Sequence, residues 1–142
     1  NVRFGIVLSK DGGALVKMLT PFNIGMGGKI GSGTQYMSWV AMDDVTGAIH
    51  HALVTDSLKG PVNITAPYPV TNIEFTHTLG KVINRPTVIP MPAFAARLAL
   101  GEMAKDLLLA SAKVAPKKLS DSGYEFQYPE LEDALRHALS VD

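Results

Sequence analysis

The sequence predicts an α/β fold in which strands alternate with helices and pair at least partly in parallel. The chain opens on the apolar run VRFGIVL, residues 2–8, which is typical of a strand buried on both faces. Two further strand-like runs, YMSWVAM at 36–42 and GPVNITA at 60–66, are each followed by a helical pattern. Two-sided burial is typical of a parallel sheet, and parallel strands cannot be joined by a local hairpin. The first strand therefore needs neighbours, and we expect part of its sheet to lie outside this sequence.

Length and composition restrict the class of protein. The chain has 142 residues, enough for one hydrophobic core, and no cysteine for disulfides, a thiolate nucleophile or a cysteine metal site. Thirteen basic and thirteen acidic side chains cancel, and no basic cluster with interleaved aromatics argues for nucleic-acid binding. Charged residues interrupt the apolar stretch around 93–110, so it does not predict a membrane span. We expect a cytoplasmic protein that binds neither nucleic acid nor membrane.

The first helix is predicted over residues 14–24. Its apolar side chains recur at helical spacing, and they are Ala14, Leu15, Met18, Leu19 and Phe22. Asp11 is the expected N-cap. Pro21 is expected to kink this helix or to end it early.

Five glycines crowd the segment GMGGKIGSG at 25–33, and two interpretations compete for it. A phosphate-binding loop needs backbone N–H groups at the start of a helix that directly follows a strand. Here a helix precedes the glycines, a strand-like run follows them, and neither GxxxxGK[ST] nor GxGxxG is matched. We therefore favour a mobile substrate-side or connecting loop over a phosphate-binding loop.

After the strand at 36–42, Asp43 or Asp44 is expected to cap a helix that continues to residue 53. The apolar stripe predicted for this helix consists of Val45, Ala48, Ile49, Ala52 and Leu53. Two adjacent carboxylates could also serve acid–base chemistry, but their position directly before a helical stripe favours the capping role.

The region after residue 60 begins with the third strand and continues into helices. Thr71 and Glu74 form the capping box of a helix whose apolar side chains are Ile73, Phe75, Leu79, Val82 and Ile83. Residues 85–92 are expected to be extended. Residues 93–111 are expected to form one or two helices, with Gly101 as the hinge or stop.

The last part of the chain predicts two more helices with a strand between them. A short helix is predicted at 116–123, with Pro116 in its first turn and Gly123 just past its end. The run YEFQY at 124–128 alternates like an edge strand. Pro129 opens a last helix whose apolar side consists of Leu131, Ala134, Leu135, Ala138 and Leu139.

Patterns for metal binding and catalysis are weak. The four histidines are His50, His51, His77 and His137, no two of them four residues apart, so we expect surface or rim positions and no metal. No serine stands in a GxSxG nucleophile elbow. Trp39 follows the glycine-rich segment closely and is equally consistent with a core anchor and with the wall of a pocket. By residue chemistry alone, the chain holds no self-contained catalytic site.

Several short segments resemble, in the same order, the C-terminal half of one group of proteins. They are RFGIVLSKDGGALVKML, GGKIGSGTQYMSWVAMDDVTGAIHHAL, GPVNITAPYPVTNIEF, RPTVIPMP, LGEMAKDLLLAS and VAPKKLSDSGYEF. The group is the NAD-dependent epimerase/dehydratase family, the sugar-nucleotide epimerase-like branch of the extended short-chain dehydrogenase/reductase superfamily. Its members resembling this chain end in a small C-terminal domain of unknown function. The resemblance runs from about Arg3 to Leu139.

The resemblance implies the C-terminal portion of a Rossmann-like doubly wound sheet plus a small, mostly helical substrate-side domain. Residues 1–60 would supply the last strands and helices of the Rossmann-like domain with the substrate loop, and residues 61–142 the C-terminal helical and small-sheet region. The family's glycine-rich dinucleotide loop and Tyr-x-x-x-Lys pair have no match in this sequence. Residues 2–8 would then be the sixth strand of a sheet whose first five strands lie outside this chain.

The resemblance also implies roles for residues near the first two strands. Phe4, Gly5 and Ile6 match the stretch whose backbone passes the nicotinamide end of NAD or NADP. The residues that match the loop and strand facing the substrate are Gly31, Gly33, Gln35, Met37 and Trp39. In relatives that bind nucleotide sugars, a basic residue at the position of Met37 commonly holds the diphosphate. A thioether cannot replace a guanidinium on a phosphate.

Two main hypotheses about function follow. The first is a substrate-side fragment of an NAD(P)-dependent nucleoside-diphosphate-sugar epimerase-like oxidoreductase. It would be inactive and without cofactor alone, and would close a pocket for a small-molecule substrate with the missing N-terminal half of the same protein. The second is a protein-interaction module without catalysis, since some family members are described as cell-division inhibitors and an uncovered strand edge can pair with another chain or a second copy. A folding remnant without activity is a third alternative.

Overall fold

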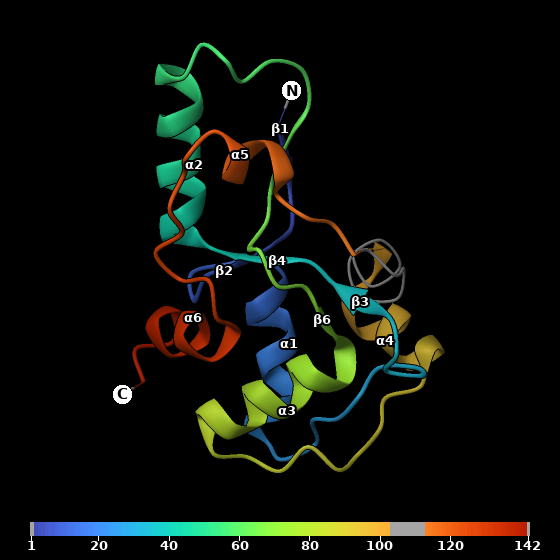
Figure 1. Cartoon of the computed structure of the whole chain (residues 1–142). Coiled ribbons are helices and arrows are strands. Elements are labelled where there is room, and N and C mark those ends of the chain that lie inside the picture. The colour runs from blue at the N-terminus through green and yellow to red at the C-terminus, as the bar shows by residue number, and fades with distance from the viewer. Residues whose placement is uncertain (1, 103–112, 142) are drawn as a thin grey trace.

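The computed structural model describes residues 2–102 and 113–141, and Figure 1 shows how its elements are arranged. The strands are β1 (Val2–Phe4), β2 (Ile6–Leu8), β3 (Tyr36–Met37), β4 (Trp39–Ala41), β5 (Val62–Ile64) and β6 (Val70–Thr71). The helices are α1 (Ala14–Asn23), α2 (Met42–Val54), α3 (Asn72–Ile83), α4 (Ala93–Leu100), α5 (Lys117–Asp121) and α6 (Leu131–Ala138). The predicted α/β class is confirmed.

The opening apolar run forms two strands that pair with different partners. β1 pairs in parallel with β5, and β2 pairs in parallel with β4. The change of partner falls at Gly5, whose N–H donates to the Ile64 carbonyl (3.2 Å), whereas the N–H of Ile6 donates to the Ser38 carbonyl (2.7 Å). A Cβ atom at Gly5 would lie 2.7 Å from the Ser38 oxygen, so glycine permits this close approach of two backbones. Parallel pairing is confirmed, but the prediction of one continuous strand over residues 2–8 is wrong.

Helices cover both faces of the β2–β4 pair, with α1, α3 and α6 on one side and α2 and α5 on the other (Figure 1). Successive side chains of a strand point to opposite faces. Accordingly, Trp39 and Ala41 join a core cluster with the first set of helices, whereas Val40 joins a second cluster with Ala48 and Leu119. This is the predicted doubly wound arrangement with two-sided burial.

β1 and β3 lie outside this two-sided arrangement. Within residues 2–102 and 113–141, β1 pairs with β5 and with no other strand, and Phe4 is 48% exposed, so the predicted two-sided burial is wrong at this end of the opening run. β3 pairs with β6 in antiparallel fashion, with Tyr36 opposite Thr71. The predicted strand 36–42 is therefore divided at Ser38 between two different sheets.

Helix α1 buries the predicted side chains Ala14, Leu15, Met18 and Phe22. Its N-cap is Gly13 (φ 81°), so the prediction that Asp11 caps it is wrong. The Asp11 N–H instead donates to Ser9 Oγ (3.1 Å), within the turn that leads to the helix. Pro21 lies in the last turn, where losing one N–H donor does not prevent the helix from reaching Asn23.

Helix α2 begins one residue before the predicted capping aspartates. Its N-cap is Ala41, without a side-chain hydrogen bond, and Asp43 and Asp44 lie in its first turn. The prediction that either aspartate is the N-cap is therefore wrong. The predicted stripe is wrong in part, because Ala48 is buried but Leu53 is 80% exposed. The buried side of α2 includes the polar residue Asp44 in addition to Ala48.

Helix α3 begins at the predicted capping box. Thr71 Oγ1 accepts from the Glu74 N–H (3.2 Å), and Glu74 Oε1 accepts from the Thr71 N–H (3.0 Å). Two backbone N–H groups that the helix itself leaves unpaired are thus satisfied within four residues of sequence.

The glycine-rich segment packs against the extended residues 85–92. The Ile89 N–H donates to the Gly27 carbonyl (3.2 Å), the Met91 N–H to the Lys29 carbonyl (2.8 Å), and the Gly31 N–H to the Met91 carbonyl (2.9 Å). The extended prediction for 85–92 is confirmed, because its backbone pairs with this segment instead of forming a helix.

The C-terminal third follows its predicted helices but not its predicted strand. α4 ends at Gly101 (φ 68°), as predicted, and the prediction of a possible second helix before residue 111 concerns residues outside the described part of the chain. Pro116 is the N-cap of α5, just before its first helical residue. Residues 124–128 form no strand, so that prediction is wrong: their backbone N–H groups at 127 and 128 bond to a side chain instead of a neighbouring strand.

The described part of the chain contains no helix long and apolar enough to cross a membrane.

We expect Gly28→Ala to lower the free energy of unfolding by about 1–3 kcal/mol, the range typical of overpacking. An added Cβ atom would overlap the Ile89 carbonyl group and force the two backbone segments apart. Urea unfolding followed by circular dichroism measures this change. Gly12→Ala is the matched control, since its Cβ would meet nothing within 4 Å. Equal stabilities of the two variants would contradict the close packing described for Gly28.

Candidate functional site

The predicted cofactor stretch lies where the opening run changes its strand partner. Phe4 is 48% exposed, Gly5 is partly buried and Ile6 is buried. Beside it lies an open depression of about 560 Å³, lined by residues 5–7, 9, 11–14 and 42. The backbone at Gly5 is thus close to a hollow surface.

The glycines at 31 and 33 shape a connecting loop. Both have positive φ angles, 60° and 73°. The Gly31 N–H donates to Met91, and the Gly33 N–H donates to the Ile30 carbonyl (3.1 Å). Because these N–H groups already bond to protein carbonyls, they do not form the cluster of free donors that a phosphate requires. The geometry agrees with the connecting-loop interpretation.

The side chains of Gln35, Met37 and Trp39 point into the protein. Gln35 Nε2 donates to the Ile30 carbonyl (2.9 Å), and Met37 Sδ accepts from Asn72 Nδ2 (3.5 Å). Trp39 has no exposed surface, and its Nε1 donates to the Tyr68 carbonyl (3.1 Å). Of the two interpretations left open for Trp39, the structure therefore selects the core anchor.

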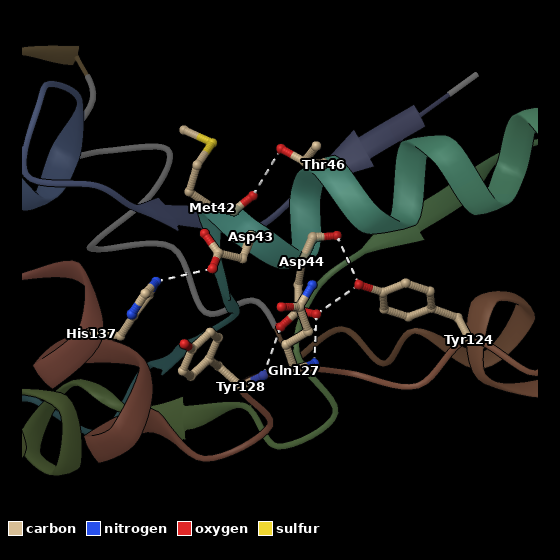
Figure 2. Close-up of polar contacts among 8 residues, drawn as sticks. All are labelled: Met42, Asp43, Asp44, Thr46, Tyr124, Gln127, Tyr128 and His137. Atoms are coloured by element: carbon tan, nitrogen blue, oxygen red, sulfur yellow. Dashed lines mark hydrogen bonds and ion pairs between the residues drawn. The ribbon is translucent and has the colours of Figure 1, made fainter.

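Asp44 forms the most extensive polar contacts in Figure 2. Its fully buried carboxylate accepts from the Tyr124 hydroxyl (2.7 Å) and from the Gln127 N–H (2.8 Å) at Oδ1, and from the Tyr128 N–H (3.0 Å) at Oδ2. The N-terminal end of α2 adds a favourable dipole. Three donors and complete burial make this carboxylate a structural link between α2 and residues 124–128, not an accessible general base.

Tyr124 is held as a neutral donor by this arrangement. Burial, followed by the hydrogen bond to Asp44 and its charge, raises the pKa of the Tyr124 hydroxyl above its ordinary value near 10. The Tyr124 ring also packs against the His51 ring in a T-shaped arrangement, with 5.6 Å between centroids, and His51 Nε2 lies 2.9 Å from Ser122 Oγ. Since Ser122 donates its own proton to the Leu119 carbonyl, His51 Nε2 must be the donor of this pair.

A second link joins the start of α2 to the last helix. His137 Nε2 lies 3.0 Å from Asp43 Oδ2, and the His137 ring stacks on Tyr128 at 4.4 Å between centroids (Figure 2). Sequence analysis missed both links. The adjacent aspartates Asp43 and Asp44 were the only sequence feature that pointed to these links. Their partners could not be identified from sequence, because they lie more than 70 positions away in the chain.

Within residues 2–102 and 113–141, no cluster of histidine and carboxylate side chains is arranged to hold a metal ion.

Comparison with known proteins places this chain among epimerase-related sequences. Residues 91–138 match the family described as "Domain of unknown function (DUF1731)". The chain is 43% identical over 136 residues to "Epimerase family protein Mb2239" of Mycobacterium bovis, covering 96% of this chain and 45% of that protein. It therefore spans about half the length of the curated relatives it matches.

Two solved structures of proteins described as epimerases are also similar to this chain. The human epimerase family protein SDR39U1 (isoform 2), solved with NADPH, superposes with a TM-score of 0.89 at 38% identity, over 98% of this chain and 47% of that one. The nucleoside-diphosphate sugar epimerase of Corynebacterium glutamicum superposes with a TM-score of 0.67 at 33% identity, over 97% of this chain and 25% of that one.

We expect Asp44→Asn to lower the free energy of unfolding by about 1.5–3 kcal/mol, because an amide removes the charge and turns its NH₂ group toward one of the three donors. Thermal and urea unfolding measure the loss.

Asp43→Asn is the matched control on the neighbouring position. Its carboxylate is 40% exposed and bonds only to His137 among the described residues, so we expect a change within about 1 kcal/mol. Equal losses for the two variants would show that the buried Asp44 link is not the stronger one.

Proposed function

We propose that this chain, which is similar to part of several epimerase family proteins, forms the substrate-side portion of an NAD(P)-dependent epimerase-like oxidoreductase. The observation that carries the proposal is the superposition of nearly the whole chain on a relative solved with NADPH. The substrate class we propose is a nucleoside-diphosphate sugar or a related small molecule. Catalysis and cofactor binding would require the N-terminal half that relatives possess.

The proposed cofactor contact is the backbone at Phe4, Gly5 and Ile6. Gly5 packs against Ser38 on the side where a Cβ would stand, but it also lines the open depression, where a flat ring could lie against the backbone. The open depression beside residues 5–7 supports this assignment, since ligand sites in open α/β sheets lie in the crevice at the carboxyl ends of the strands.

The proposed substrate-side wall consists of residues 31–39. Gly31, Gly33, Gln35, Met37 and Trp39 would contribute mainly by holding this wall in shape, because their backbone groups or side chains are already bonded within the protein. Exposed groups next to the wall, such as the 57% exposed Tyr68, are then the ones available to touch a substrate.

Position 37 is unsuited to holding a diphosphate in this protein. Met37 is 1% exposed and contacts Asn72, so its side chain is both uncharged and turned away from solvent. A nucleotide-sugar substrate would thus need its negative charge to be met from another position.

An interaction module without catalysis is the second candidate, and one observation favours it. Apolar side chains remain exposed beside the open edge of β1 and along α2: Phe4 (48%), Leu53 (80%) and Val54 (65%). Exposed apolar surface of this kind is typical of a surface that meets a partner.

We expect the 142-residue chain to show no saturable binding of NADPH, because the dinucleotide-binding loop has no counterpart in its sequence. Cofactor fluorescence and melting temperature report binding, with the human relative as positive control. Tight saturable binding by this chain alone would contradict the proposed division of roles.

The converse experiment joins this chain to the N-terminal half of the human relative. A chimera in which this chain replaces the matching part of the human relative is expected to bind NADPH and to melt at a higher temperature when NADPH is present. A folded chimera that does not bind NADPH would contradict the proposal.

For the interaction module, static light scattering over a dilution series is the test. Self-association through the exposed apolar surface predicts an apparent mass that rises with concentration, and Leu53→Glu should reduce the rise. Lys117→Glu, on an already exposed charged position of α5, is the control. A constant monomer mass throughout the series would exclude pairing between copies.

A further inference from the structure

Residues 113 and 114 cross the carboxyl ends of two strand segments. The Val114 N–H donates to Ser38 Oγ (3.0 Å), and Thr65 Oγ1 donates to the Val114 carbonyl (3.4 Å). Ser38 and Thr65 are both buried, and they follow β3 and β5 respectively. The backbone at Val114 is therefore held from both sides, which gives its neighbour Lys113 a defined starting position.

This position adjoins the proposed cofactor stretch. The two residues that hold Val114 are also the ones packed against Gly5: a Cβ atom there would lie 2.7 Å from the Ser38 oxygen and 3.1 Å from Thr65 Cγ2. Ser38 and Thr65 thus lie between Val114, the neighbour of Lys113, and the backbone assigned to the nicotinamide end of the cofactor.

The Lys113 ammonium lies over an aromatic ring. Its Nζ is 4.8 Å from the centroid of Tyr36, on strand β3, and the lysine itself is exposed. In the part of the chain that the structure describes, Nζ forms neither an ion pair nor a hydrogen bond. The ring attracts the charge but accepts none of the three N–H donors in the way an oxyanion does. A positioned cation with available donors therefore lies beside the substrate-side wall.

Lys113 also provides the charge that the wall itself lacks. Met37, the neighbour of Tyr36 on β3, is buried and uncharged. The side chains that fix the 113–114 segment, Ser38 and Thr65, are polar but neutral.

We propose that Lys113, placed over Tyr36, binds an oxyanion of the substrate, either a phosphate or a carboxylate. This assignment rests on the proposed function for the identity of the ligand as substrate, but the binding itself does not require the cofactor. Tyr36 contributes by guiding the lysine chain, and an anion would draw the ammonium toward itself at the edge of the ring.

The test is an NMR titration of the 142-residue chain with inorganic pyrophosphate at constant ionic strength. We expect saturable shifts of the Tyr36 ring signals and of the Val114 amide signal. Lys113→Gln should weaken this binding about tenfold or more, as loss of a charge-assisted hydrogen bond does, and Lys113→Arg should retain it. Lys117→Gln, on an exposed lysine four residues later, should titrate like the unsubstituted chain.

Parallel titrations distinguish the two kinds of oxyanion. Stronger binding of pyrophosphate than of malonate assigns a phosphate, the reverse order assigns a carboxylate, and neutral glucose should produce no shift. The proposal is overturned if the unsubstituted chain shows no saturable shift at Tyr36 and Val114, or if Lys113→Gln titrates unchanged. If the chimera fails to bind NADPH but the pyrophosphate titration gives the expected shifts, the proposed function is refuted and the role of Lys113 is not. If the chimera binds NADPH but the titration shows no binding that depends on Lys113, the role of Lys113 is refuted and the proposed function is not.

Discussion

The buried carboxylate of Asp44 determines how residues 124–128 pack against the start of α2. A charge without solvent contact requires hydrogen-bond donors, and a backbone segment more than 80 positions later provides two of them. Meeting that requirement holds residues 124–128 against the start of α2. It also leads the chain directly into α6, whose Leu131, Ala134 and Leu135 complete the larger core cluster. The packing of the last helix therefore depends on a polar contact as well as on apolar burial.

Gly5 imposes a second constraint of a different kind. The opening run can pair first with β5 and then with β4, because the backbones at residues 5 and 38 approach more closely than a side chain at position 5 would allow. The same close approach brings together the ends of the parallel strands, the depression beside residues 5–7 and the segment that carries Lys113. The proposed cofactor and substrate surfaces thus meet at one backbone crossing.

At the candidate site, the family resemblance predicted which region faces the substrate, and the structure shows which of its groups are accessible. The resemblance selected residues 31–39 as a substrate-facing region, whereas the structure describes how that region is built: Gln35, Met37 and Trp39 are bonded inward, and exposed aromatic and basic groups lie beside them. Lys113 could not be chosen from sequence, because its position over Tyr36 depends on tertiary contacts, among them the hydrogen bonds of Val114 to Ser38 and Thr65.

The sequence by itself determined those features whose causes lie within a few residues. The apolar runs, the Thr71–Glu74 capping box and the end of α4 at Gly101 were all predictable, since each depends on local hydrogen bonds or on a local φ angle. Only the tertiary structure decided which face of α2 is buried and that residues 124–128 form no strand. Both outcomes depend on Asp44 and donors remote in sequence, and no local pattern encodes which distant groups a buried charge will find.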